Sequence, residues 1–276
     1  MKYLKIFGKI LLTLVVLSII AYTILIVLVR PSNNRDWTTD QAVLPYAEIN
    51  GNQVAVHNIR NFSYTSTSDY TPNYYDATFD LEKIKNVYFV DEPFSGYVGA
   101  AHTFLSFEFE DNRFVSISVE IRKEKGESFS AVKGILRQYE LTYVIADERD
   151  VVKLRSNYRH DKVYMYPIKT TPEKMRAVFL SMIERTNKLK EKPEFYNTIF
   201  SNCTTNLAKH VNEVTPGRVS WNITYLLPEN ADKYLYEVGL IDRTRSFEET
   251  RIAHFINDLA IKYADDFDFS LKIRGR

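Results

Sequence analysis

The sequence predicts an α+β fold, in which one N-terminal transmembrane helix precedes a single domain with a central antiparallel sheet and flanking helices. Three observations support this prediction. Residues 10–29 form an uncharged apolar run, residues 102–121 alternate between apolar and polar positions, and residues 172–190 repeat apolar positions with the period of a helix. Residues 31–276 are enough for one sizeable core, so we expect one domain.

The run from Ile10 to Val29 has the length of a membrane-spanning helix, because twenty residues at about 1.5 Å each cover about 30 Å. Lys2, Lys5 and Lys9 precede the run and mixed charges follow it, which favours a cytoplasmic N-terminus and an exported domain. No small-residue cleavage site follows, so we expect an uncleaved signal anchor. The expected organisation is a cytoplasmic N-terminus (1–9), a transmembrane signal anchor (10–29), a tether (30–41) and a domain (42–276).

Charge and composition exclude several classes of protein. The chain has 36 basic and 35 acidic side chains, a formal net charge of +1, so it lacks the positive surface that nucleic-acid binding requires, and we expect no nucleic-acid partner. No spacing of His and Cys is typical of a metal site, and no glycine-rich phosphate loop is present. We therefore expect neither a metal nor a cofactor.

The clearest local prediction is a β-hairpin built from "HTFLSFEF" and "RFVSISVEI". Glu110, Asp111 and Asn112 form its three-residue loop, in which Asn112 takes the left-handed conformation. The loop sets a register in which facing positions sum to 222 and the apolar side chains share one face. On the other, polar face this register places His102 opposite Glu120, Phe104 opposite Ser118, and Ser106 opposite Ser116.

The elements after the hairpin follow from periodicity and capping signals. We expect a short helix over 129–139 and strands over 141–146 and 163–168. Thr171 as N-cap and Pro172 at the first helical position open a helix that reaches about Lys190. A further helix begins after Ser201 or Asn202.

Cys203 is the only cysteine, and it lies in the first turn of that last helix. Unpaired backbone N–H groups and the positive end of the helix dipole stabilise a thiolate there, which predicts a nucleophile. In this interpretation His102 takes the thiol proton, and Glu120 or Ser118 orients the imidazole. The alternative is that Cys203 is a buried structural residue.

Arg122 follows the second strand of the hairpin, in the segment "IRKEKGE". This segment is most simply a solvated strand end and turn. Arg122 nevertheless emerges on the same face as His102, where a guanidinium would bind a substrate phosphate or carboxylate.

Several segments resemble the bacterial family named for the Lnb N-terminal periplasmic domain, in unbroken order from about Asn58 to the C-terminus. They are "GAAHTFLSFEF", "SVEIRKEKGESFSA", "QYELTYVIADERD", "LRSNYR", "FYNTIFSNCTTNL" and "ADDFDFSLKIR". The Lnb proteins are implicated in N-acylation of lipoproteins, in which an acyl chain passes from phospholipid to the amino-terminal Cys. The resemblance implies a single-pass protein of the bacterial inner membrane with its C-terminal domain in the periplasm.

The order of His, a polar residue and then "NC" at a helix start is also similar to permuted papain-like (NlpC/P60-like) proteins, such as the lecithin retinol acyltransferase group. The resemblance implies Cys203 as the nucleophile that forms a thioester, His102 as the base, and Asn202 and Glu120 as supporting groups. The implied partners are a phospholipid acyl donor and a lipoprotein or other envelope acceptor. Lnb-type acyltransferases carry further membrane spans after the domain, and none follows it here up to Arg276.

Two other functions remain open on the sequence. The same dyad would serve a Cys/His hydrolase, an amidase or peptidase of envelope substrates. A non-catalytic envelope binding protein, in which Cys203 is only structural, is the third hypothesis.

Overall fold

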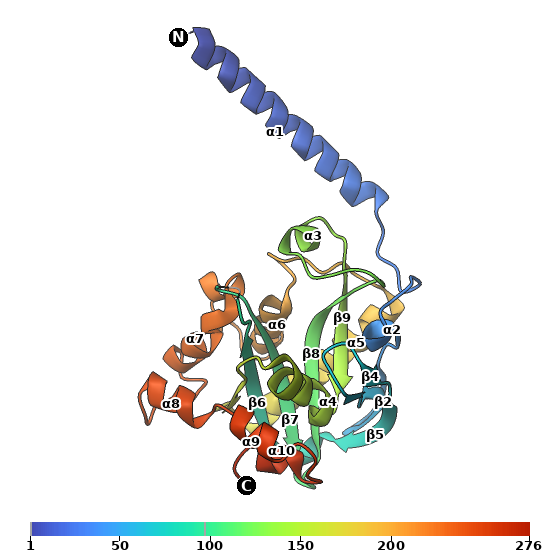
Figure 1. Ribbon diagram of the computed structural model, residues 1–276, viewed down its shortest axis with the longest axis vertical. Coiled ribbons are helices and arrows are strands. Elements are labelled where there is room, and N and C mark those ends of the chain that lie inside the picture. The colour runs from blue at the N-terminus through green and yellow to red at the C-terminus, as the bar shows by residue number, and fades with distance from the viewer. Residues whose placement is uncertain (1, 97) are drawn as a thin grey trace.

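The structure is a computed structural model that describes residues 2–96 and 98–276, and it confirms the α+β class. Most of helix α1 (Lys2–Leu28) extends away from the domain (Figure 1), and its C-terminal part contacts the domain at Ile135 and Arg137. It is long and apolar enough to cross a membrane from Tyr3 to Leu28. The helix begins before the predicted range 10–29, since it also includes the residues that precede the uncharged run.

The domain is built on an eight-stranded sheet. Along it lie β1, β2, β9, β8, β7, β6 and β10, in that order, and β5 pairs with β2. The pairs are antiparallel except for one parallel contact, between Arg60 of β2 and Ala146 of β9. The strands are β1 (Tyr46–Asn50), β2 (Gln53–Arg60), β5 (Tyr74–Asp80), β6 (Ile84–Pro93), β7 (Ala101–Phe109), β8 (Phe114–Arg122), β9 (Glu140–Ala146) and β10 (Tyr164–Pro167). A separate ribbon pairs β3 (Ser63–Tyr64) with β4 (Tyr70–Thr71).

The hairpin β7–β8 has the predicted register and turn. Phe104 pairs with Ser118 and Phe107 with Val115, each pair summing to 222, and Asn112 has a φ of 59°. The ladder between the two strands stops at Phe104 and Ser118, short of the predicted pair of His102 and Glu120. Because β7 stays paired to β6 through Ala101, and β8 to β9 through Arg122, the two strands diverge at this end of the sheet.

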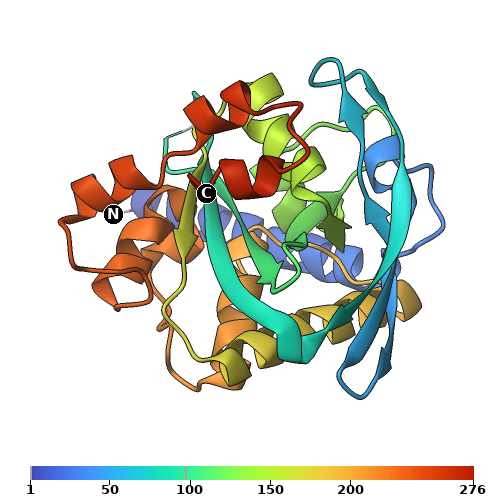
Figure 2. The same cartoon turned by 90° about the horizontal axis from the view of Figure 1, so that it is seen from below.

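Helices cover both faces of the sheet. The apolar face of the hairpin packs against α5 (Pro172–Glu191) and α6 (Cys203–Val214) in the main core, with Phe107 and Phe179 fully buried at its centre. The other face packs under α4 (Glu148–Lys153), the π-helical turn η2 (Leu154–Arg159), α9 (Asn257–Lys262) and α10 (Phe269–Lys272). In Figure 2, the gold helix α5 and the red C-terminal helices lie on opposite sides of the curved sheet.

The face predicted to be polar is therefore buried. Its serines and acids contact side chains of the opposing layer: Ser106 hydrogen-bonds Glu148, Arg274 pairs with Glu148 at 2.6 Å, and Arg276 pairs with Glu108 at 2.8 Å. Buried polar groups require such partners, so this layer is held by hydrogen bonds and ion pairs as well as by a second apolar core around Phe104.

The predicted helix starts are confirmed. Thr171 caps α5 by accepting a hydrogen bond from the backbone N–H of Lys174, and Asn202 caps α6. The helix expected over 129–139 is shorter, α3 (Ala131–Ile135). The remaining helices are α2 (Thr39–Ala42), η1 (Leu81–Lys83), η3 (Ile223–Tyr225), η4 (Pro228–Asn230), α7 (Ala231–Glu237) and α8 (Phe247–Ala253).

Residues 30–41, expected to be a tether, lie against the domain. Trp37 is buried, and its indole N–H donates to the carbonyl of Asn33. The side chain of Asn33 donates to the carbonyls of Leu189 and Lys190 at the end of α5. The end of α1 is thus connected to the domain through a packed segment.

Candidate active site

Cys203 is the first residue of α6, and the helix start is well defined. The Asn202 side chain accepts from the backbone N–H of Thr205 at 2.8 Å, and the Thr205 hydroxyl accepts from the backbone N–H of Asn202 at 2.8 Å. This capping box fixes the first turn, so the buried thiol lies next to N–H groups that have no partner within the helix.

Asn202 also holds the two loops beside Cys203. Its Nδ2 donates to the carbonyl of Thr198 at 2.9 Å and to the carbonyl of Tyr225 at 2.7 Å. Both amide hydrogens are therefore used within the protein. The supporting role implied for Asn202 is positional in this geometry.

His102 lies where β7 diverges from β8, and a serine connects it to a carboxylate. Its Nε2 is 2.7 Å from Oγ of Ser118 and 3.3 Å from Oε1 of Glu120, and Ser118 Oγ is 2.7 Å from the same carboxylate oxygen. An ionised carboxylate only accepts hydrogen bonds, so the serine hydroxyl donates to Glu120 and accepts from Nε2. Ser118 and Glu120, the two candidates for orienting the imidazole, thus form one chain of hydrogen bonds that starts at His102.

The thiol and the imidazole perturb each other. Burial raises the pKa of Cys203, but a hydrogen bond with His102, the charge of that ring and the backbone N–H of Thr103 lower it to about 7. Burial lowers the pKa of His102, but the charge of Glu120 and hydrogen bonds with Cys203 and Glu120 raise it to about 10. Between these values, a thiolate and an imidazolium are the dominant pair.

Arg155 completes the charge arrangement, and sequence reasoning missed it. Its Nη2 donates to Oε1 of Glu120 at 2.9 Å, and its Nε donates to Oε2 of Glu92 at 2.5 Å. Burial opposes ionisation of Glu120, yet His102, Arg155 and Ser118 hold its pKa well below the ordinary range. In the sequence, Arg155 is visible only as an arginine in "LRSNYR", one of the segments that resemble the Lnb family.

The expectation that Arg122 binds a substrate anion needs correction. Its guanidinium is buried and donates to the carbonyls of Gln41 and Ala42 and to the side chain of Asn33, each at 2.9 Å. The ring of Trp37 lies 4.2 Å away. Because its donors are engaged by the segment that follows α1, Arg122 anchors that segment.

Asp91 is a second residue that sequence reasoning missed. It pairs with Thr103 in the ladder between β6 and β7 and is fully buried. Neither of its carboxylate oxygens has a hydrogen-bond partner among the described residues. Burial, and then the charge of Asp232, raise the pKa of Asp91 well above the ordinary range, and the charge of Cys203 adds to the shift. In the sequence, this residue could have been noticed as an acid inside the apolar strand "VYFVDEP".

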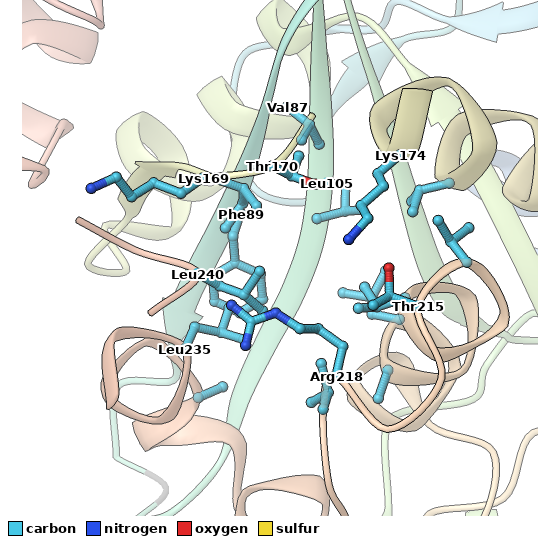
Figure 3. A pocket seen from close by; sticks show the side chains of 18 of the residues that line it. Val87, Phe89, Leu105, Lys169, Thr170, Lys174, Thr215, Arg218, Leu235 and Leu240 are labelled. Carbon is cyan, nitrogen blue, oxygen red and sulfur yellow. The ribbon is translucent and has the colours of Figure 1, made fainter. Parts of the chain in front are cut away.

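A cavity of about 310 Å³ lies on the apolar face of the sheet, and Thr204, the residue after Cys203, belongs to its lining. Thr204 and Leu207 bring α6 into its wall, and Lys169, Lys174 and Arg218 border it (Figure 3). Most of the wall is apolar, with side chains from β6, β7, α5, α6 and α7: Val87, Phe89, Leu105, Met175, Val178, Leu207, Val211, Ala231 and Leu235. Its size falls in the range of small-molecule sites, roughly 300–1,000 Å³.

Within residues 2–96 and 98–276, no group of three or more His, Cys or acidic side chains has the arrangement of a metal site.

Comparison with protein families matches the chain to the family described as the Lnb N-terminal periplasmic domain, over residues 70–231. The matched region runs from β4 to the start of α7 and includes His102, Ser118, Glu120 and Cys203. A search of curated proteins and a search of solved structures each returned no match.

Proposed function

The chain belongs to the family of the Lnb N-terminal periplasmic domain, and we propose that it is a thiol-dependent acyltransferase that carries a fatty acyl chain on Cys203. The family and the N-terminal apolar helix fit a membrane-anchored periplasmic protein. The observation that carries the proposal is the position of Cys203 in the first turn of α6, where His102 lowers the pKa of its thiol to about 7, while the next residues of α6 line an apolar cavity. The proposed orientation places the N-terminus in the cytoplasm and the domain on the periplasmic side of the inner membrane.

The first half-reaction acylates the thiol. The Cys203 thiolate attacks the ester carbonyl of a lipid, so that a carbon–sulfur bond forms and the carbon–oxygen bond to the alcohol breaks. The His102 imidazolium gives its proton to the departing alkoxide. The relay through Ser118 to Glu120 keeps the ring oriented and offsets its positive charge before the transfer.

The second half-reaction transfers the acyl chain. An acceptor amine attacks the thioester carbonyl, neutral His102 takes the amine proton, and the carbon–sulfur bond breaks to regenerate the thiolate and the imidazolium. The product is an amide. Water in place of the amine gives the hydrolase, which is the alternative outcome of the same site.

The oxyanion of each step has candidate donors in this site. The backbone N–H groups of Cys203 and Thr204 belong to the first turn of α6 and have no partner within the helix. Tyr196 is also close: burial and the negative charges of Cys203 and Glu120 raise its pKa far above the ordinary range. Its hydroxyl therefore keeps its proton and is available as a donor.

The cavity matches an acyl chain with an anionic headgroup. Two residues of α6 close to Cys203 in the sequence line it: Thr204 is the next residue, and Leu207 lies one helical turn further on. The three bordering cations suit a lipid phosphate, because a charge-assisted hydrogen bond to phosphate is stronger than a neutral one.

Intact-mass spectrometry of the full chain tests the proposal, after incubation with bacterial phospholipids and then with neutral hydroxylamine. We expect an adduct with the mass of a fatty acyl chain on the wild type, removed by hydroxylamine and absent from Cys203→Ala. Cys203→Ser is the matched control, because an oxyester on serine resists hydroxylamine.

Other results would support other functions. No adduct, with cleavage of an envelope peptide that depends on Cys203, would indicate the hydrolase. No adduct, with iodoacetamide reacting at the rate of an ordinary thiol, would indicate a binding protein with a structural cysteine.

A further inference from the structure

Exposed apolar side chains gather around the start of α6. In the described part of the domain, nine large apolar side chains are more than half exposed. Three of them, Ile252, Ile261 and Phe267, lie on the C-terminal helical region, at the lower end of the domain in Figure 1. The other six form what we call the apolar rim: Val98, Phe129, Val132, Phe200, Trp221 and Ile223.

The apolar rim comes from four segments that contact one another. The Thr198 hydroxyl donates to the carbonyl of Ala131, which joins the loop of Phe200 to α3. Asn202 donates to the carbonyl of Tyr225, which joins the start of α6 to the segment of Trp221 and Ile223. Glu229 donates its backbone N–H to the carbonyl of Gly99, which joins the β6–β7 loop to the same region.

The membrane helix meets the domain at this same end (Figure 1). The Tyr22 hydroxyl lies 3.4 Å from the carbonyl oxygen of Ile135 in α3, and Nη1 of Arg137 lies 3.4 Å from the carbonyl oxygen of Ile26. Tyr22 is six residues before the end of α1, about 9 Å along a helix. The α3 side of the apolar rim therefore lies at the depth of the last two turns of α1, where a bilayer surrounding α1 has its interface.

We propose that the apolar rim docks onto the bilayer that α1 spans, on the domain side, so that the end of the domain at which α6 begins faces lipid. Trp and Phe are the side chains that suit this layer, since an aromatic ring partitions to the headgroup region. In the membrane, lipid then covers these six side chains, and they are exposed to water only when the protein is taken out of the bilayer. The docking is independent of the chemistry proposed for Cys203.

The two tryptophans allow a direct test, because Trp37 is 6% exposed and Trp221 is 69% exposed. The full chain is reconstituted into vesicles of phosphatidylcholine and phosphatidylglycerol, with or without bromine near the top of the acyl chains. We expect bromine to reduce Trp221 emission roughly twofold, because its ring lies at the headgroup level. The bromine effect should disappear in Trp221→Phe, which leaves only buried Trp37.

A tryptophan at the far end provides the matched control. The double variant Trp221→Phe with Phe267→Trp places an exposed indole on the C-terminal region, and we expect no bromine effect there. Equal Trp221 emission in brominated and unbrominated vesicles would overturn the proposal. So would an emission that changes with the protein-to-lipid ratio and not with bromine, since that result indicates a second copy of the chain on the apolar rim.

The test also separates this proposal from the acyltransferase. Cys203→Ala lacks the thiol but keeps the apolar rim, so we expect its bromine effect to equal that of the wild type. An intact bromine effect without an acyl adduct would contradict only the proposed function. An acyl adduct without a bromine effect would contradict only the docking.

Discussion

The two faces of the hairpin β7–β8 are both buried, but one is packed by apolar side chains and the other by hydrogen-bonded polar and charged side chains. On one face Leu105 and Phe107 pack into an apolar core under α5 and α6. On the other, His102, Ser118 and Glu120 belong to a network that ends on Arg155 of the π-helical turn. The candidate site lies where the strands diverge, so that a thiol from the helix on the apolar side meets an imidazole from the polar side. One face thus supplies an apolar core and a cavity, while the other supplies the carboxylate of Glu120 that raises the pKa of His102.

Removing the imidazole gives the largest expected effect on the polar side. In His102→Ala the thiol keeps its burial, which raises its pKa, and loses the hydrogen bond and charge that lower it. We expect acylation to fall by about 10²–10⁴-fold, the usual contribution of a general acid–base group. The pH dependence of iodoacetamide labelling checks the cause.

In the wild type, labelling should rise with pH through about 7, as the thiolate forms. The acyl-transfer rate should fall again as the pH passes about 10 and the imidazolium loses its proton. A labelling curve of His102→Ala that coincides with that of the wild type would show that the two residues do not interact.

Removing bulk from the apolar face should cost stability and leave the thiol pair intact. Phe107 is fully buried beside Phe179, with ring centroids 5.0 Å apart. We expect Phe107→Ala to lower the free energy of unfolding by about 3–5 kcal/mol, measured by urea denaturation. Its labelling pKa should stay that of the wild type at temperatures where it is folded. A shifted pKa would mean that the faces are more strongly coupled than the packing indicates.

Two serines on the polar face offer a matched pair. Ser118 connects His102 to Glu120, whereas the hydroxyl of Ser116 has no hydrogen-bond partner among the described residues. We expect Ser118→Ala to slow acylation about tenfold and to lower the pKa of His102, because one charge-assisted hydrogen bond is lost, worth about 1.5 kcal/mol or more. Ser116→Ala should change neither value. Equal effects of the two substitutions would refute the relay.

The smallest expected effect concerns Asp91 on the apolar face. Burial raises its pKa in the folded protein, so the native state binds more protons than the unfolded state and stability falls as pH rises above the unfolded pKa. Asp91→Asn removes this titration, and we expect it to raise stability at pH 7 by on the order of 1 kcal/mol. The gain should shrink as pH falls toward 4, near the pKa of an unfolded aspartate. Denaturation at several pH values checks the sign, and a gain that is constant with pH would contradict it.

Much of the fold could be predicted because its signals are local. Alternation and a loop that accepts Asn112 in the left-handed conformation defined the hairpin register. Thr171 marked one helix start, and Ser201 or Asn202 marked another, which the structure assigns to Asn202. The burial of the polar face could not be predicted, because a row of serines and acids gives the same sequence pattern whether water or another layer of the protein covers it.

The candidate site divides in the same way. The sequence alone determined an apolar helix long enough for a membrane, a hairpin that carries His102 and Glu120 on one face, and a cysteine in the first turn of a helix. These features depend on backbone periodicity and capping, which act over a few residues. Only the tertiary structure decided that β7 and β8 diverge, that Arg155 holds Glu120, and that Arg122 anchors the segment after α1. It also decided that Asp91 is buried without a hydrogen-bond partner among the described residues. Each of these depends on contacts between residues far apart in the chain, and such contacts are settled by the packing of whole layers against one another.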